Sequence, residues 1–553
     1  MKESARKRAG IALGFLWLHA LCALRFPWEN VPLYASWLRV SLDLTAYVGI
    51  GLLVRALFTR GGRCAGWGSR IGLVHVLAGL TLLLVLFRFA YTLMPVFFGR
   101  EVDLYNDIDM FPGLVHLLLH RQGLVLQVLG IVVALLLGAL VYWATQRAWC
   151  TVLDTLGGDS TGKVLASLGF LTLVGVVDLQ TNDESYFVTS YLSDDVASAC
   201  SEIVASHREL ARYADQLDAA RLRLEGVATD LDHIRGTDVF ILFIESYGRC
   251  LFRDPELRGQ LETWSGPWLQ RLESAGYSMR TAFAFPSVRG GNSSMAHAEF
   301  MSGVPTWTRR SFDRLLASDL RSLPDFFREA GYRTFNVQPA MPRAWKEGKF
   351  FGFTDDIFQA DFPYAGTAYH WGTMPDQYAL AYLLQEYIIG SDKPVFVQFV
   401  SVTSHAPFSM IPPYIEDWER AAEGAAFAGP PAHDYGIGWL EYVGHPRLAE
   451  AYLASIRYSL DTAFQFIAQL ERDALVLVLG DHQPPRIGAF QELDQSFDVP
   501  IHVIARDQRA LAAFEPFGFQ DGFLPATTTG NFSTSRILTS FLESFSSGEE
   551  QTR

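Results

Sequence analysis

Three apolar runs in this chain each end in side chains that can hold a metal ion or move a proton. These side chains are Glu245 and Ser246 after the run 239–244, Asp481 and His482 after the run 474–479 and Gly480, and His405 in the loop after 395–400. Carboxylates and imidazoles are the ligands that proteins use for transition metals. A polar residue at the start of any one loop would be ordinary, but three such groups at the ends of three separate runs favour a metal site.

A second set of candidate residues lies in a loop rich in glycine and hydroxyl side chains. The segment 285–294 reads FPSVRGGNSS and precedes a helix-like run at 295–301. Hydroxyls at a helix N-terminus meet unpaired backbone N–H groups and the positive end of the helix dipole, which together suit a phosphoryl group. Ser293 or Ser294 could attack a phosphoryl group held there. Simple N-capping is the alternative for this segment taken alone.

The runs that carry these groups have the composition of buried parallel strands. A continuous β-branched and aromatic run suits a strand that is covered on both faces, and open α/β sheets place ligands at the carboxyl ends of their strands. From residue 237 onward such runs alternate with helical patterns, which predicts a doubly wound α/β sheet. Further expected elements are strands at 332–337 and 499–504 and helices at 268–275, 320–330, 380–389, 448–470 and 535–545.

The N-terminal third of the chain has the character of a membrane domain. The chain has 553 residues, too many for one ordinary domain, and its apolar excess lies before residue 180. Five segments approach the ~20 residues that cross a hydrocarbon core, at 10–26, 37–58, 71–97, 123–143 and 164–179. Basic residues precede the first segment and separate the second from the third. The positive-inside rule then places the N-terminus in the cytoplasm and everything after the fifth span outside.

The boundary between the two parts is predicted to be helical. Apolar or small residues recur every seven positions within 196–234, which indicates an amphipathic helix packed on the soluble part or lying at the membrane surface. A dimerising coiled coil, and hence a homodimer, is the alternative. We therefore expect a transmembrane domain at 1–180, a connector at 181–236 and a catalytic domain at 237–553. Asp43 and Arg88, within or near apolar spans, are candidates for a lipid, gating or structural role.

Charge and cysteine usage exclude several function classes. The net charge of -14 makes nucleic acid a poor partner. The five cysteines show no CxxC spacing, so neither a zinc ribbon nor a redox motif is indicated.

Four motifs together resemble the alkaline phosphatase–sulfatase superfamily. They are FIES at 243–246, EFMSG at 299–303 after the hydroxyl-bearing loop, SVTSHAPF at 401–408 and LGDHQPP at 479–485. More narrowly, the chain resembles the branch of membrane-anchored lipoteichoic acid synthases and of phosphoglycerol and phosphoethanolamine transferases. This resemblance implies an N-terminal α-helical transmembrane bundle of five spans and a C-terminal α/β sulfatase-like domain. It also implies a cell inner membrane protein whose catalytic domain is periplasmic or otherwise extracytoplasmic.

The resemblance also implies roles for individual residues. Glu245, Asp481 and His482 match metal ligands, and the nucleophile would be a further ligand. Counting back from Ser302 selects Ser293 as the nucleophile, whereas counting back from Glu299 falls on Met295, which cannot serve, so Ser294 stays open. The implied substrate-binding residues are His405, Arg343, Trp345 and Asp376.

The activity implied by the resemblance is a metal-dependent phosphotransfer. One divalent ion, Mn²⁺ or Zn²⁺, would lower the pKa of the attacking oxygen and stabilise charge on phosphorus. Ser293 would take a phosphoglycerol head group from a membrane phospholipid and pass it to a glycan or polymer acceptor. Phosphatidylglycerol is favoured over phosphatidylethanolamine as donor, because phosphoethanolamine transferases tend to carry several disulfides and only Cys200 and Cys250 lie beyond the spans.

The alternatives are a phosphoethanolamine transferase, a sulfatase-like hydrolase and a non-catalytic member that binds lipid or glycan. A sulfatase would need an arginine close after the modified residue for conversion to formylglycine. The segment 294–298 has alanine at the position where this arginine is required, so the hydrolase is disfavoured.

Overall fold

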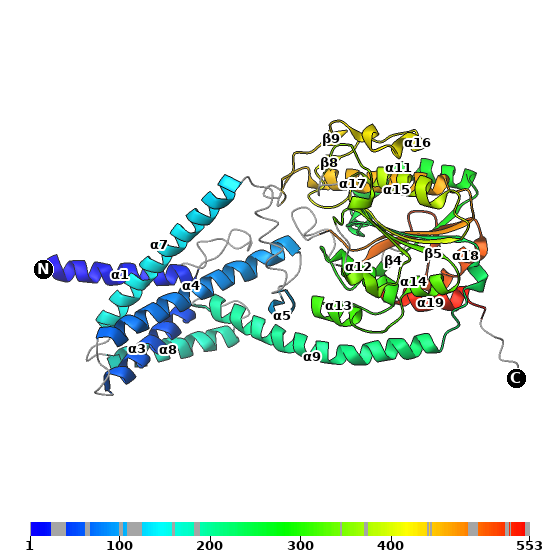
Figure 1. Cartoon of the computed structure of the whole chain (residues 1–553). Helices are drawn as coiled ribbons and strands as arrows, with labels where there is room; N and C mark the ends of the chain where they lie inside the picture. Colours follow the sequence, from blue (N-terminus) through cyan, green and yellow to red (C-terminus); the bar gives the residue numbers. More distant parts are fainter. Residues whose placement is uncertain are drawn as a thin grey trace. The chain divides into compact units, whose positions relative to one another are not determined.

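The computed structural model is shown in Figure 1. It describes residues 2–23, 40–60, 67–98, 103–107, 124–156, 161–181, 188–342, 346–369, 374–438, 442, 445–484, 496–525, 530 and 532–547. The chain divides into two compact units. The first comprises Met1–Val96 and Glu101–His207, and the second comprises Phe97–Arg100 and Arg208–Arg553.

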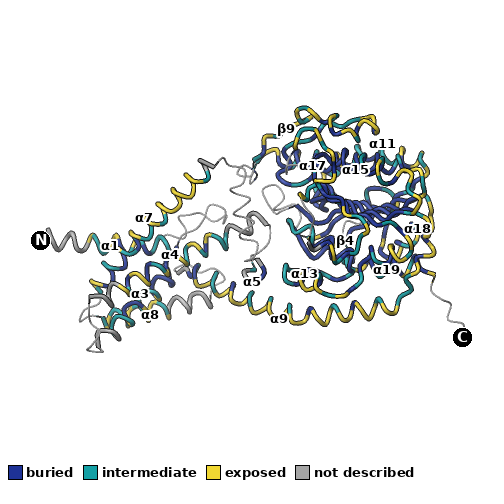
Figure 2. The backbone as a smooth tube through the Cα atoms, in the orientation of Figure 1, coloured by how far each residue is buried: buried dark blue, intermediate teal, exposed yellow. Residues whose placement is uncertain are grey.

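The first unit is built from long apolar helices. They are α1 (Lys2–Cys22), α3 (Leu42–Arg60), α4 (Trp67–Phe98), α7 (Leu124–Leu156) and α8 (Thr161–Thr181), with the short α5 (Leu104–Asp107) and a pairing of β1 (Val40–Ser41) with β2 (Val188–Thr189). Each of the five expected spans overlaps one of the long helices, but the expected number of five membrane spans is not confirmed. Within the described residues, Gly72–Thr92 and Gln127–Leu156 are long and apolar enough to cross a membrane, whereas Ala9–Cys22 and Thr161–Leu173 are shorter apolar helices. Figure 2 shows the first half of α7 largely exposed, although its side chains are apolar, whereas the second half contributes Trp149 and Val152 to the core of this unit.

The charged residues of this unit hold the start of a long helix, α9 (Tyr191–Glu225). The Asp43 carboxylate accepts hydrogen bonds from the backbone N–H groups of Leu192 and Ser193, each at 3.0 Å. Arg88 pairs with Asp195 in the first turns of α9. Unpaired N–H groups at a helix start favour a carboxylate such as that of Asp43. Asp43 and Arg88 therefore each have a structural partner in α9.

The second half of α9 packs on the α/β unit. Tyr213 and Ala220 are buried in one of its two cores, and Leu217 and Leu224 pack against the same core. The apolar residues repeated every seven positions therefore face the soluble unit in this half, which is the packed amphipathic helix expected from the sequence.

The second unit is organised around a mixed sheet with nine strands among the described residues, in the order β12-β4-β11-β10-β3-β7-β5-β6, and β13 beside β4. The strands are β3 (Asp238–Ile244), β4 (Ser278–Phe285), β5 (Arg333–Gln338), β6 (Asp355–Phe358), β7 (Val395–Val400), β10 (Ala474–Gly480), β11 (Val499–Ala505), β12 (Gln520–Asp521) and β13 (Phe532–Ser533). A separate small ribbon pairs β8 (Met410–Ile411) with β9 (His433–Asp434). The strand β4 was not expected, and β11 runs antiparallel to both β4 and β10, so this side of the sheet is not parallel.

Helices cover both faces of this sheet (Figure 1). One face carries α11 (Pro255–Ser274), α15 (Asp376–Leu383) and α17 (Leu448–Ala468), and the other carries α12 (Ser293–Ser302), α14 (Leu323–Glu329) and α19 (Ile537–Phe545). Shorter helices are α10 (Cys250–Arg253), α13 (Arg309–Leu316), α16 (Trp418–Ala421) and α18 (Gln508–Ala512).

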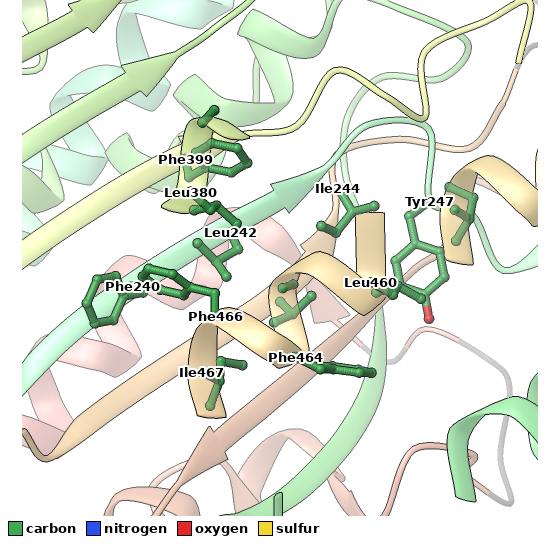
Figure 3. Packing of buried hydrophobic residues seen from close by; sticks show 14 of the residues in the cluster. Phe240, Leu242, Ile244, Tyr247, Leu380, Phe399, Leu460, Phe464, Phe466 and Ile467 are labelled. Carbon is green, nitrogen blue, oxygen red and sulfur yellow. The ribbon is translucent and has the colours of Figure 1, made fainter. Parts of the chain in front are cut away.

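The central strand β3 supplies both cores because successive side chains point to opposite faces. Phe240, Leu242 and Ile244 lie in the core under α17, and Figure 3 shows them beside Leu460, Phe464 and Phe466. Val239, Ile241 and Phe243 lie in the core under α12. A strand buried on both faces must be apolar throughout, which explains the unbroken run seen in the sequence.

Candidate metal centre and nucleophile

Three parallel strands end side by side and deliver the predicted site residues to one edge of the sheet. In the register of the ladder, Gly480 of β10 lies opposite Ile244 of β3, and Val400 of β7 lies opposite Phe243. The next residues along the three strands are Glu245, Asp481 and Ser401. The carboxyl ends of β3, β7 and β10 thus meet, as the sequence predicts.

Glu245, Asp481 and His482 converge closely enough to hold one ion. One ligand atom from each residue lies within 4.8 Å of the other two. The Nε2 atom of His482 is 3.4 Å from Oε1 of Glu245 and 3.6 Å from Oδ2 of Asp481. All three residues are buried. These separations are those of ligands that share one cation, because metal–ligand bonds of about 2.0–2.2 Å place adjacent ligand atoms about 3 Å or more apart.

Of the two candidate serines, Ser293 lies against this group. Its Oγ donates a hydrogen bond to Oε2 of Glu245 at 2.9 Å and lies 3.1 Å from Nε2 of His482. Ser293 is the first residue of α12, and Asn292 before it adopts a left-handed conformation with φ of 63°. Ser294 follows about 100° further around the helix. The structure therefore brings Ser293 to the carboxylate and the imidazole.

Ser246 ties the two carboxylates together through a strained turn. Its φ is 59°, a left-handed conformation that few residues with a side chain adopt. In this conformation its N–H donates to Oδ1 of Asp481 at 2.9 Å and its Oγ donates to Oε1 of Glu245 at 2.8 Å. Its carbonyl accepts a hydrogen bond of 2.7 Å from the hydroxyl of Tyr452. The sequence places Ser246 at the strand end but does not reveal its contacts, and nothing in the sequence indicates the contact from Tyr452.

The donor set fits a divalent cation, and two details of hydrogen bonding support this. His482 Nδ1 lies 2.9 Å from the carbonyl of Gln483, which can only accept, so the neutral ring carries its proton there and presents a lone pair at Nε2. Oδ1 of Asp481 accepts from two backbone N–H groups, whereas Oδ2 is buried without a hydrogen-bond partner. A buried carboxylate oxygen without a partner is costly unless a cation or donor meets it.

The electrostatics of the group show the same need for positive charge. Burial, followed by the nearby charge of Glu245, raises the pKa of Asp481 to about 6. Burial disfavours charge on His482, but Asp481 and Glu245 together outweigh it and raise the pKa of this imidazole. Burial also disfavours charge on Glu245, yet His482 and His405 lower its pKa overall. Two carboxylates in an apolar setting thus depend on neighbouring positive charge.

His405 lies on the loop after β7, which is fastened to the backbone of Glu245. The N–H of Glu245 donates to Oγ of Ser401 at 2.9 Å, and Oγ of Ser404 donates to the carbonyl of Glu245 at 2.7 Å. Nδ1 of His405 lies 2.8 Å from the carbonyl of Ala406, so the neutral ring has its lone pair at Nε2. The loop therefore places a half-buried imidazole beside the predicted metal ligands.

Asp376 lies beneath this same loop. It is buried at the start of α15, and its oxygens accept hydrogen bonds from the N–H groups of Val402, at 2.6 Å, and Thr403, and from the hydroxyl of Ser459. Burial raises the pKa of Asp376, while these donors act in the opposite direction. Its expected contact with substrate stays a prediction. Arg343 and Trp345, the other substrate-binding candidates, lie outside the described residues.

Glu299 holds α12, the helix that begins with Ser293, in place. It is fully buried in α12 and accepts hydrogen bonds from the N–H of Ser287 at 2.7 Å and from the hydroxyl of Ser533 at 2.8 Å. The glutamate of the EFMSG motif thus connects α12 to the loop before it and to the C-terminal segment.

Comparison with known families finds one match within the second unit. Residues 277–525 match the family model described as Sulfatase. This segment includes Ser293, His405, Asp481 and His482, while Glu245 lies ahead of it. The second unit therefore contains a sulfatase-like α/β domain, as expected from the motifs. No curated protein matches the chain.

Solved structures with a similar arrangement are distant in sequence. A protein in the alkaline phosphatase superfamily from Vibrio parahaemolyticus is 18% identical with a TM-score of 0.34, and the match covers 51% of this chain and 62% of that one. The phosphoglycerol transferase GacH from Streptococcus pyogenes is 12% identical with a TM-score of 0.35, covering 61% and 92%. The lipooligosaccharide phosphoethanolamine transferase A from Neisseria meningitidis is 14% identical with a TM-score of 0.41, covering 91% and 94%.

Proposed function

We propose that this protein is a metal-dependent phosphotransferase of the alkaline phosphatase superfamily. It moves a phosphoglycerol head group from a membrane phospholipid, through Ser293, to a hydroxyl of an extracytoplasmic glycan or polymer. The observation that carries this proposal is the position of the Ser293 hydroxyl, 2.9 Å from Glu245 and 3.1 Å from His482 within a group of three buried metal-ligand side chains. Structural capping alone would not require that convergence.

The residues that would hold the cation are Glu245, Ser293, Asp481 and His482. Mixed oxygen and nitrogen ligation suits Mn²⁺ or Zn²⁺ better than Ca²⁺. When bound, such an ion acts as a Lewis acid that lowers the pKa of a hydroxyl and stabilises charge on phosphorus.

The residues of the chain then perform two displacements. In the first, Oγ of Ser293 forms a bond to the phosphorus of the donor lipid, the bond from phosphorus to the diacylglycerol oxygen breaks, and the serine proton ends on diacylglycerol. In the second, the acceptor hydroxyl forms the bond to phosphorus, the bond to Ser293 breaks, and the acceptor proton returns to the serine. His405 lies beside Glu245 and would contact the phosphoryl oxygens.

The membrane location is part of the proposal. We propose a five-span bundle in the cell inner membrane with the catalytic domain outside. The two apolar helices at Gly72–Thr92 and Gln127–Leu156 support a membrane anchor. Anchoring at the bilayer supplies a lipid donor at high effective concentration, which a free enzyme would lack.

Phosphatidylglycerol is the proposed donor in preference to phosphatidylethanolamine. Cys200 is exposed on α9 and Cys250 is buried in the α/β unit, and no disulfide joins them. The described part of the outer domain thus lacks the set of disulfides that the phosphoethanolamine branch tends to carry.

The proposal is tested by incubating the purified full-length protein and Mn²⁺ or Zn²⁺ with vesicles that contain head-group-labelled phosphatidylglycerol or phosphatidylethanolamine. We expect diacylglycerol release from phosphatidylglycerol. Ser293→Ala should lower the rate by on the order of 10³-fold or more, because the attacking atom is lost. Ser294→Ala is the matched control and should retain activity.

The outcomes separate the alternatives. Release from phosphatidylethanolamine alone would replace the donor and keep the phosphotransferase. Release from neither lipid with the metal bound would overturn the transferase and leave a non-catalytic member. Equal loss in the two serine variants would overturn the assignment of Ser293.

A further inference from the structure

Two polar atoms beside the proposed metal centre are buried without a hydrogen-bond partner, and they face each other. One is Oδ2 of Asp481 and the other is Nε2 of His297. They are 3.8 Å apart, and both residues are at least 95% buried, with exposed fractions of 1% and 4%. A buried polar atom without a hydrogen-bond partner lowers the stability of a folded protein. Two such atoms that lie next to each other indicate that they interact.

The fold places His297 next to Asp481, on the same helix face as Ser293. His297 lies in α12 four residues after Ser293, so both side chains project from the same face of the helix. Its ring packs on Phe243 of β3, with ring centroids 4.3 Å apart. Helical side chains lean toward the helix N-terminus, and this direction carries the imidazole toward the metal-ligand group.

The distances favour a contact to Asp481 over direct ligation of the ion. Among the described residues, the atoms close enough together to share an ion belong to Glu245, Asp481 and His482. A separation of 3.8 Å is longer than an N–H···O hydrogen bond of about 2.7–3.2 Å, but a small rotation of either side chain would close it. Oδ2 has a second lone pair for such a donor, in addition to the one that would face a cation.

We propose that His297 is a positioning residue for Asp481. Its Nε2–H donates a hydrogen bond to Oδ2 and fixes the plane of the carboxylate that holds the ion. Together with the two N–H groups on Oδ1, this contact leaves Asp481 a single orientation. Partners of this kind raise metal affinity by orienting the ligand, and their loss typically costs 10–100-fold. The inference rests on the proposed metal centre.

The competing explanation is that His297 merely fills space against Phe243. The two explanations predict different effects when His297 is replaced by another residue. An aromatic ring without a donor satisfies packing, whereas an amide that carries N–H at the same reach satisfies the hydrogen bond. The Nε2 atoms of glutamine and histidine are the same number of bonds from the backbone.

The test measures the affinity of the full-length protein for Mn²⁺ and Zn²⁺ by competition with a chelator. We expect His297→Phe to weaken binding about 10–100-fold and His297→Gln to stay within a few-fold of the parent protein. Met295→Leu, a buried apolar change on the same helix, is the matched control and should bind as the parent does. The melting temperature of the metal-free protein verifies the fold of each variant, and His297→Met replaces His297→Phe if that variant does not fold.

The results also separate this inference from the function on which it rests. If the parent protein binds the metal and Asp481→Ala does not, the centre exists. Equal affinity of His297→Phe and the parent would then overturn the role of His297 alone. X-ray absorption of the bound metal should show one imidazole, from His482, and two imidazoles would overturn the positioning role in favour of direct ligation. A parent protein that holds no metal would overturn both.

Discussion

Replacement of Asp376 distinguishes a residue that holds the His405 loop from one that touches substrate. Asp376→Ala would leave the buried N–H of Val402 without an acceptor and the buried Ser459 hydroxyl without its partner, and would also remove the acceptor of the partly buried N–H of Thr403. Each unsatisfied buried group costs about 1–3 kcal/mol, so the Val402 N–H and the Ser459 hydroxyl place the loss of unfolding free energy at roughly 2–6 kcal/mol.

Asp376→Asn should be much milder. The amide oxygen can still accept from the two N–H groups, and the amide NH₂ can donate to the Ser459 hydroxyl. The cost is then the loss of charge assistance, about 1–2 kcal/mol. The ordering of parent, asparagine and alanine therefore follows from the donors around the carboxylate.

The assay combines a urea transition, followed by tryptophan fluorescence, with steady-state kinetics on the labelled lipid. We expect the urea midpoint to fall in the order parent, asparagine, alanine, and kcat to fall with it because the His405 loop loses its support. An alanine variant with the midpoint of the parent and a raised KM would refute this reasoning and assign Asp376 to the substrate.

Three further predictions concern the fold. Gly480→Ala should lower the unfolding free energy by about 1–3 kcal/mol and release metal in the chelator assay, because a Cβ there would meet the carbonyl of Tyr247; a variant that retains metal would contradict this. Burial lowers the pKa of His502 from 6.5 to about 3, so the unfolded chain takes up the proton first as pH falls and stability is lost below pH 6.5. Between pH 7 and pH 5 the protonation of His502 in the unfolded chain should lower the free energy of unfolding by about 2 kcal/mol, measured by urea titration. His502→Gln should abolish this part of the pH dependence, and an unchanged pH dependence in that variant would contradict the prediction. Tyr213→Ala should cost about 3–5 kcal/mol if α9 packs on the α/β core, whereas Leu222→Ala, at a side chain that is 68% exposed, should change stability by under about 0.5 kcal/mol.

The central strands could be predicted because their burial leaves a direct trace in the sequence. β3, β7 and β10 have covers on both faces and therefore consist of almost continuous apolar residues. β4 escaped prediction because its sequence SMRTAFAF includes Arg280, whose side chain reaches Glu515 and Asp521 at the surface. β4 pairs with β11, more than 200 residues further along the chain, and the residues of β4 alone do not indicate this pairing.

The sequence predicts the site residues that directly follow buried strands. It does not predict those whose place depends on which side of a helix they occupy. Glu245, Asp481 and His482 follow buried strands, so their convergence follows from the topology. Which of Ser293 and Ser294 lies against Glu245 depends on where α12 begins, at the left-handed Asn292, and the residue types do not reveal this. His297 is surrounded by apolar residues in the sequence, and only its side of the helix reveals a relation to Asp481.

The strand-end convergence has a consequence for biogenesis. Glu245 emerges from the ribosome more than two hundred residues before His482, and the segment between them contains α12 and much of the sheet. A chain that stops short of β10 has no site to load. Under the proposed function, cation binding would therefore be a late event that only a completed α/β unit can perform, and the ion would add its binding energy after the long-range strand pairing has been made.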